Sequence, residues 1–353
     1  MNLKNKIIFI LFCFPLLWMS CQCNQAKDKH FDIPNTENRV SLQSMRLDSI
    51  VFHSPFIHAQ QFQSHLLQTS KNSICPLVED ILRMGPCEDS STFKQLYQFS
   101  VFKDIADLQR AVEGTFTNNE IRQFNQHFSD AFTRLKLTLP NEVIPQMVYM
   151  NGGLAAASYA KDEQLFIGLD SYLYPHPIVK EFPADRFPLY KRKNMQAQYL
   201  VPNAIFNWMS YRYSQYDSLP PEKNDFLSSL IYSGKLMYAT DLLLPEMADS
   251  LKMMWSEEEM LWAKEHEFQI WKEIARQEVM FGTQRNEILK WFNEAPHTFA
   301  GNIPSDSPAQ LGIWMGWQIV KAYMSKNENI SLASLLQERN HQKILSAYKP
   351  PLP

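Results

Sequence analysis

The sequence predicts a mainly helical α+β protein with one small antiparallel sheet around residues 143–168. The chain has only 10 glycines and as many as 16 methionines in 353 residues, a composition that favours helices. β-forming residues are concentrated from Val143 to Tyr149, and the tight-turn signal Asn151-Gly152-Gly153 follows them. Hydrophobic residues make up 45% of the chain, enough to build a large core.

The first 40 residues divide into a leader and a tether. A basic start precedes an apolar run from Ile7 to Met19, which is too short to span a bilayer and is typical of a secretory signal peptide. Ser20-Cys21 at its end matches the lipoprotein pattern, in which Cys21 is diacylated and becomes the first mature residue. An ordinary signal peptide with an incidental cysteine is the alternative. We therefore expect a leader over residues 1–20, a polar tether over 21–40 and one globular domain over 41–353.

Apolar residues at helical spacing predict helices from about residue 40 to 139, and again from about residue 195 to the end. Thr117 is a capping residue before a helix that runs toward Leu135. Ser256 and Glu259 form a capping box, which predicts a helix to about Met280. Short strands are expected at Ala155–Tyr159 and Gln164–Gly168.

The pair Ser307-Pro308 predicts the start of a buried helix that runs to Met324. Gly312 and Gly316 lie four residues apart on one face of this helix. Because each glycine costs about 1 kcal/mol relative to alanine in a helix, the pair indicates close packing of another backbone or side chain.

Two cysteines of the expected domain, Cys75 and Cys87, could form a disulfide that closes a short loop. Export makes this bond chemically reasonable. No C-x-x-C pair occurs, so a thioredoxin-like protein or a zinc ribbon has no support.

Complete catalytic motifs are missing from the sequence. It contains no G-x-S-x-G elbow and no phosphate-binding glycine loop. His266-Glu267 begins a zinc motif, but Ile270 stands where the second histidine would be needed. The net charge of −3 argues against nucleic acid as a partner. We expect no cofactor and no metal.

Three segments carry a family resemblance: Gly168 to Leu173, Tyr232 to Pro245 and Ser307 to Met324. In order and in content they resemble the GldB family of gliding-motility lipoproteins of the Bacteroidota. The residues that match its motifs, and for which the resemblance implies structural roles, are Gly234, Lys235, Ser307, Pro308, Gly312, Trp314, Gly316 and Trp317.

That family is distantly similar to zincin-like peptidases, which carry H-E-x-x-H on one helix and a further Glu-Gly on a later one. The resemblance places Asn203 and Asn207 at the two histidine positions, Ala204 at the general base and Ser233 at the later glutamate. It thus implies an inactive, metallopeptidase-like scaffold, because asparagine is a poor zinc ligand and alanine cannot accept a proton.

The resemblance therefore implies a non-catalytic lipoprotein, held by Cys21 in the cell envelope, most simply at the periplasmic face of the outer membrane. Its partners would be the membrane and other proteins of a motility or type IX secretion complex. One alternative is a zinc-dependent peptidase or cell-wall hydrolase with an unrecognised site. Another is a module that binds a peptide or glycan in a cleft lined by Trp208, Tyr211 and Tyr213.

Overall fold

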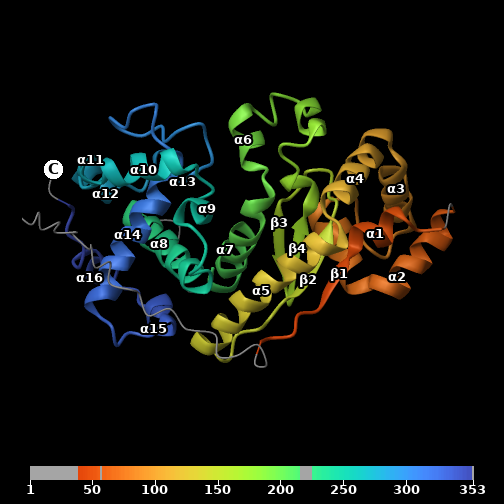
Figure 1. Ribbon diagram of the computed structural model, residues 1–353, viewed down its shortest axis with the longest axis horizontal. Coiled ribbons are helices and arrows are strands. Elements are labelled where there is room, and N and C mark those ends of the chain that lie inside the picture. The colour runs from red at the N-terminus through yellow and green to blue at the C-terminus, as the bar shows by residue number, and fades with distance from the viewer. Residues whose placement is uncertain (1–38, 56–57, 215–224, 352–353) are drawn as a thin grey trace, which may run out of the picture. The chain divides into compact units, whose positions relative to one another are not determined.

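The computed structural model describes residues 39–55, 58–214 and 225–351. Within them it shows a small sheet with helices against both of its faces (Figure 1). The predicted fold class, mainly helical α+β, is confirmed. Cys21, the leader and nearly all of the expected tether lie outside the described residues. No helix among the described residues is both long and apolar enough to cross a membrane.

The sheet was predicted to be antiparallel, but it is mixed. Its order is β1-β2-β4-β3, and only β3 and β4 run antiparallel. The first strand was missed because it is three residues long and lies in a segment with helical spacing. The strands are β1 (Ser44–Arg46), β2 (Gln146–Met150), β3 (Ser158–Lys161) and β4 (Gln164–Gly168).

The two faces of the sheet belong to different hydrophobic cores. Val148, Met150 and Phe166 pack with the N-terminal helices. Met147, Tyr149, Leu165 and Ile167, on alternate positions, face the larger core that continues to the C-terminal end. Both central strands, β2 and β4, are thus covered on each side, which explains their nearly unbroken apolar sequence.

The first three N-terminal helices pack on one face of the sheet, whereas the next two bury their apolar residues in the larger core (Figure 1). Cys75 and Cys87 are joined by a disulfide, with their Cα atoms 5.2 Å apart. Thr117 caps α5 through the N–H of Asn119, as its sequence position predicts. The helices are α1 (Leu47–Phe52), α2 (Ala59–Pro76), α3 (Ser90–Val101), α4 (Lys103–Thr115) and α5 (Asn118–Thr138), with a π-helix η2 at Leu77–Ile81.

The remaining helices build the larger core, in which α8 and α14 pack side by side (Figure 1). They are α6 (Leu189–Asn194), α7 (Leu200–Tyr213), α8 (Phe226–Leu243), α9 (Asp249–Met253), α10 (Glu257–Glu265), α11 (Glu267–Ile274), α12 (Gln277–Met280), α13 (Arg285–Phe292), α14 (Leu311–Lys326), α15 (Leu332–Gln337) and α16 (His341–Leu345). Short 3-10 turns are η3 (Leu169–Tyr172), η4 (Pro177–Glu181) and η5 (Ala197–Tyr199).

The helix predicted from Ser256 to Met280 is wrong in its length. Its capping box is present, but the segment is divided into α10, α11 and α12. The first break is at His266, whose ring stacks on Trp262 at 4.1 Å and contacts the Trp262 carbonyl through Nδ1 at 2.8 Å. Side-chain bonding of this kind competes with regular helix geometry.

The predicted start of the last long helix at Ser307-Pro308 is also wrong. Helix α14 begins at Leu311, after Gln310 in a left-handed conformation with φ of 62°. The Pro308 carbonyl accepts the hydroxyl of Thr298 at 2.9 Å, so it does not serve a helix. Ser307 and Pro308 therefore belong to a loop that is fixed from outside the helix.

Candidate binding cavity

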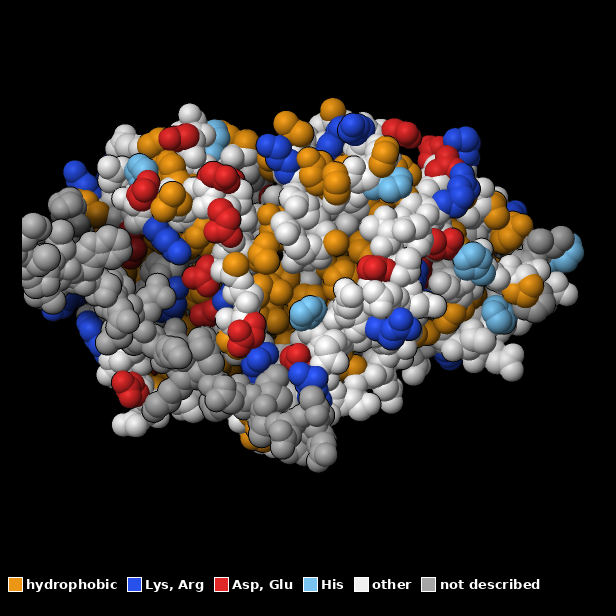
Figure 2. Space-filling model, viewed as in Figure 1, with side chains coloured by type: hydrophobic (Ala, Val, Ile, Leu, Met, Phe, Trp, Pro, Cys, Tyr) orange, Lys and Arg blue, Asp and Glu red, His pale blue; other side chains and the backbone are white. Residues whose placement is uncertain are grey.

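A cavity of about 400 Å³ lies between the sheet edge and the larger core. Ala155–Ala157, the segment that leads into β3, forms one wall, and Asn203 and Asn207 of α7 lie beside it. Met237 of α8 and Ile313 of α14 contribute from the other side. Figure 2 shows hydrophobic side chains exposed in a hollow over this part of the molecule.

The two asparagines predicted at zinc-ligand positions are brought together at this cavity. Asn207 donates through Nδ2 to Asn203 Oδ1 at 2.9 Å and also to the hydroxyl of Ser158 in β3. Their spacing of four residues puts both side chains on one face of α7. The hydrogen bond from Asn207 to Ser158 connects α7 to the edge strand β3, and neither side chain of the asparagine pair carries a charge.

The other two predicted positions are not at the cavity. Ala204 is fully buried in the core behind α7. Ser233 is half-buried on α8, one turn before Met237, and is not among the residues that line the cavity. Among the aromatic residues considered for a cleft, Trp208 and Tyr213 are buried in the core, and Tyr211 accepts the N–H of Asp162.

Tyr172, at the wall of the cavity, was not predicted from the sequence. Its side chain is 1% exposed, and burial raises the pKa of its phenol well above the usual range. Asn203 lies close enough to lower that pKa slightly, although its contact with the hydroxyl falls outside hydrogen-bond geometry. The hydroxyl is therefore held neutral next to the asparagine pair.

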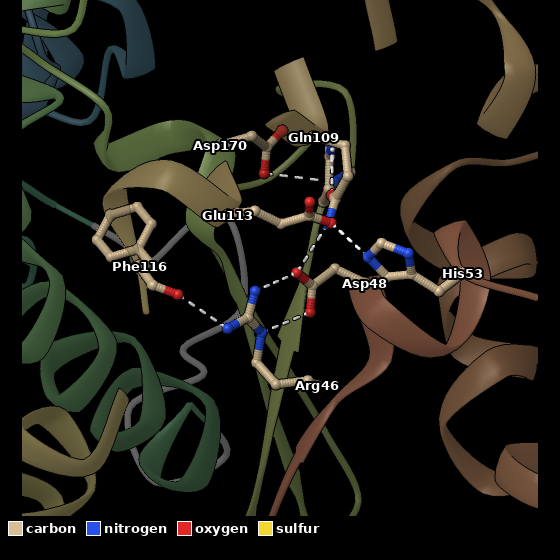
Figure 3. A network of polar contacts seen from close by, with 9 residues as sticks. Arg46, Asp48, His53, Gln109, Glu113, Phe116 and Asp170 are labelled. Carbon is tan, nitrogen blue, oxygen red and sulfur yellow. Dashed lines mark hydrogen bonds and ion pairs between the residues drawn. The ribbon is translucent and has the colours of Figure 1, made fainter. Parts of the chain in front are cut away.

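Asp170 fixes the wall segment from behind (Figure 3). Its buried carboxylate accepts the backbone N–H of Gly152 at 3.3 Å and that of Leu154 at 2.5 Å. A side chain at Gly168 would clash with the Ala156 carbonyl, because an added Cβ would lie 2.2 Å from that oxygen. The motif Gly168-Leu169-Asp170 thus shapes the wall and does not enter the cavity.

Behind Asp170, a network of polar side chains joins the N-terminal helices to the same turn (Figure 3). Arg46 and the buried Asp48 form a bidentate pair at 2.8 and 2.6 Å. Gln109 donates to Asp48 at 3.2 Å and accepts from Asn151 at 3.1 Å. The oxygen of Asn151 then accepts the N–H of Gly153 at 3.1 Å. Sequence reasoning found only the turn, because the hydrogen bonds that join it to Gln109 and Gln109 to Asp48 span 42 and 61 residues of the chain.

Burial raises the pKa of Asp170 to about 6, and the nearby Asp48 adds to the rise. Because the folded-state pKa exceeds the ordinary value of 3.8, the folded state binds this proton more tightly than the unfolded state. The stabilisation of the folded state by this proton is fully present below pH 4 and is lost as the pH rises through 6. The free energy of unfolding of the wild type, minus that of Asp170→Asn, should fall by about 3 kcal/mol across this window.

This difference can be measured by urea unfolding of both proteins at several values between pH 4 and 7.5. The matched variant Asp306→Asn removes an exposed carboxylate and controls for the loss of one charge. A wild-type minus Asp170→Asn difference that stays constant with pH would contradict the assignment.

The residues of the family motif lie in and around the contact between α8 and α14. An added Cβ at Gly316 would lie 2.1 Å from the carbonyl oxygen of Leu230, and one at Gly234 would lie 2.2 Å from that of Gly316. Gly312 faces the Phe292 ring in the same way. The two glycines of α14 thus let other groups approach the helix closely, the backbone of α8 at Gly316 and the Phe292 ring at Gly312, as their spacing predicts.

The polar and aromatic members of the motif stabilise the same region. Lys235 is fully buried and donates to the Glu338 carbonyl at 2.6 Å. Trp314 and Trp317 are buried, and the Lys321 ammonium lies 3.9 Å from the Trp317 ring centre. Ser307 is buried in the loop before α14. These positions are structural and lie mostly away from the cavity.

Chemistry at the cavity is limited by its donor groups. Within the described residues, no three His, Cys, Asp or Glu side chains are grouped so that they could hold a metal ion. Lys252, which lines the cavity, is 2% exposed and pairs with Asp241 and with Asp249 at 3.2 Å. The asparagine pair does not fit zinc, which prefers imidazole, thiolate and carboxylate ligands.

The model of the family described as gliding motility protein GldB matches residues 28–350. No curated protein and no solved structure matches the chain. Because the family match extends over nearly the whole sequence, the chain belongs to the GldB family of gliding motility proteins.

Proposed function

We propose that this chain is a non-catalytic lipoprotein, anchored by Cys21 at the periplasmic face of the outer membrane. There it supports the gliding-motility apparatus and the associated secretion machine. The family supports the motility role, and the leader sequence with Ser20-Cys21 supports the anchor. The disulfide between Cys75 and Cys87 is consistent with an exported domain.

The observation that carries the non-catalytic part is the asparagine pair at the cavity. Asn207 donates to Asn203 and to Ser158, and the resemblance assigns these two asparagines to the positions at which a zincin-like enzyme would hold its metal. Ala204 cannot act as a general base and is buried in the core. We infer a degenerate zincin-like scaffold that retains the cavity and has lost the catalytic groups.

The charged groups of the cavity support the same interpretation. Glu294 is the one carboxylate among the residues that line it, and it accepts from the Asn194 amide at 3.3 Å. Lys252 is paired with two aspartates and is not free to act as a base. Paired carboxylates or a histidine with an orienting partner, which hydrolases use, have no counterpart there.

Zinc content tests this proposal directly. The purified full-length chain, incubated with zinc and then passed through a desalting column, should retain less than about one tenth of an equivalent, since amides are weak ligands. Metal is measured by mass spectrometry. One tightly held zinc per chain would contradict the proposal, and Asn203→Ala then locates it: zinc lost in this variant lies at the cavity, and zinc that is retained lies elsewhere.

A further inference from the structure

We propose that the cavity holds an extended peptide segment of a partner protein, with one large apolar side chain inside and an acidic residue beside it at the rim. The inference rests on the proposed non-catalytic function, because the segment is held and not cleaved. Three independent features of the cavity indicate this ligand: its amides, its methionines and the charge of its rim.

The polar side chains of the cavity match a peptide backbone. Asn194, Asn203, Asn207 and Gln310 all line it, and a side-chain amide has two donor hydrogens and an acceptor oxygen. A peptide group likewise offers a donor and an acceptor. Asn207 donates within the protein to Asn203 and Ser158, whereas Asn194 and Gln310 donate once each, to Glu294 and to the Phe292 carbonyl, and keep a second hydrogen for a ligand. The wall at Ala155–Ala157 runs directly into β3, which is the edge strand of the sheet. Among the described residues β3 pairs with β4 alone, and α7 packs against it. An extended chain can lie along such a wall.

The apolar part of the cavity suits one large and variable side chain. Met195, Met237, Met253 and Met254 line it together with Phe206. Methionine is flexible and polarisable, so it adapts to different apolar partners, as at other surfaces that bind varied peptides.

The α6 side of the cavity rim is positively charged, although the whole chain carries −3 and the lining also contains one carboxylate, Glu294, which accepts from the Asn194 amide. Lys191 lines the cavity, and α6 continues with Arg192 and Lys193. Arg192 bonds to the backbone carbonyls of Phe187 and Phe182, both at 2.6 Å, so its charge is not neutralised by a carboxylate there. Figure 2 shows basic and hydrophobic side chains together over the region of α6.

Residues 180–193 contain five basic and two acidic side chains, Glu181 and Asp185 being the acidic ones. Leu189 in the same segment is 66% exposed. The excess of positive charge at the rim favours a carboxylate on the ligand, next to the apolar side chain that enters the cavity.

Binding can be measured with a short fluorescent peptide, blocked at both ends, that carries one leucine, two neighbouring glutamates and otherwise serine and threonine. One sister peptide replaces the leucine by serine, another the glutamates by lysine, and a maltooligosaccharide is the glycan probe. With the full-length chain in detergent, anisotropy should show saturable binding of the first peptide. Each sister peptide should bind about 10-fold more weakly, which is about 1.4 kcal/mol.

Two variants assign this binding to the cavity. Ala155→Trp fills the wall at an exposed position and should weaken binding at least about 10-fold, whereas Ala275→Trp, at an exposed position outside the cavity, should not. Lys191→Glu should reverse the preference toward the lysine peptide, and Lys264→Glu, the same charge change on α10, should leave it unchanged. Melting temperatures confirm that each variant is folded.

Equal affinity for all three peptides, absence of saturable binding, or binding of the oligosaccharide that Ala155→Trp blocks would overturn the peptide inference. Mass spectrometry of the recovered peptide separates this failure from that of the proposed function. An intact peptide that does not bind contradicts the ligand alone, whereas a cleaved peptide contradicts the non-catalytic role.

Discussion

Gly316→Ala should lower the free energy of unfolding by about 3 kcal/mol or more. Alanine is the better helix former by about 1 kcal/mol, so propensity alone would predict stabilisation. The clash outweighs it, because the new Cβ would lie 2.1 Å from the Leu230 carbonyl oxygen and 3.1 Å from the Gly234 nitrogen. Both atoms belong to the backbone of α8, so the clash can be relieved only if α8 and α14 move apart. This separation would also loosen the packing of the buried Trp314 and Trp317 of α14.

The matched control is Gly114→Ala in α4. This glycine is exposed, and an added Cβ would meet nothing within 4 Å. Here propensity acts without a clash, so stability should rise by up to about 1 kcal/mol. Urea unfolding of the two variants and the wild type measures both effects. The packing account fails if Gly316→Ala is as stable as Gly114→Ala.

Cys21→Ser should move the protein from the membrane fraction to the soluble fraction. A diacylated cysteine buries two chains, at about 0.8 kcal/mol for each CH₂ group, which is enough for stable anchoring. Serine cannot be lipidated through a thioether, and no helix among the described residues could span the bilayer in its place. Fractionation of cells, followed by immunoblotting of membrane and soluble material, measures the change.

Cys23→Ser is the control for this experiment, because it removes a neighbouring thiol from the same segment. It should stay entirely in the membrane fraction. Retention of Cys21→Ser in the membrane fraction would show that the association does not depend on Cys21, and release of Cys23→Ser would show that the effect is not specific to Cys21. Mass spectrometry of the N-terminal peptide should find the acyl chains on Cys21 in the wild type and in Cys23→Ser.

The sequence predicts the fold class and several local features well, since these depend on neighbouring residues. The cap at Thr117 and the capping box at Ser256 are both present. The predicted start at Ser307-Pro308 fails because Thr298, ten residues before Pro308, donates to the Pro308 carbonyl. Strand β1 exists through its pairing with β2, about 100 residues away, and three residues give no periodicity of their own.

The cavity could be predicted only in part. Family resemblance pointed to Asn203 and Asn207, and both lie at the cavity. Ala204 and Ser233 do not, because the first faces the core and the second lies a turn away from the lining. The methionines and the basic rim come from elements far apart in the chain, so no local pattern marks them. Asp170 holds the wall by accepting backbone N–H groups. Every residue type except proline has such a group, so the sequence does not reveal these contacts.

The most direct test of the account is whether motility depends on the anchored protein. In a strain that lacks the chromosomal gene, colony spreading and the amount of protein exported to the medium are measured after complementation. The account predicts that the wild type and Cys23→Ser restore both, and that Cys21→Ser, expressed at the same level, restores neither. Full restoration by Cys21→Ser would contradict a role for this protein at the membrane.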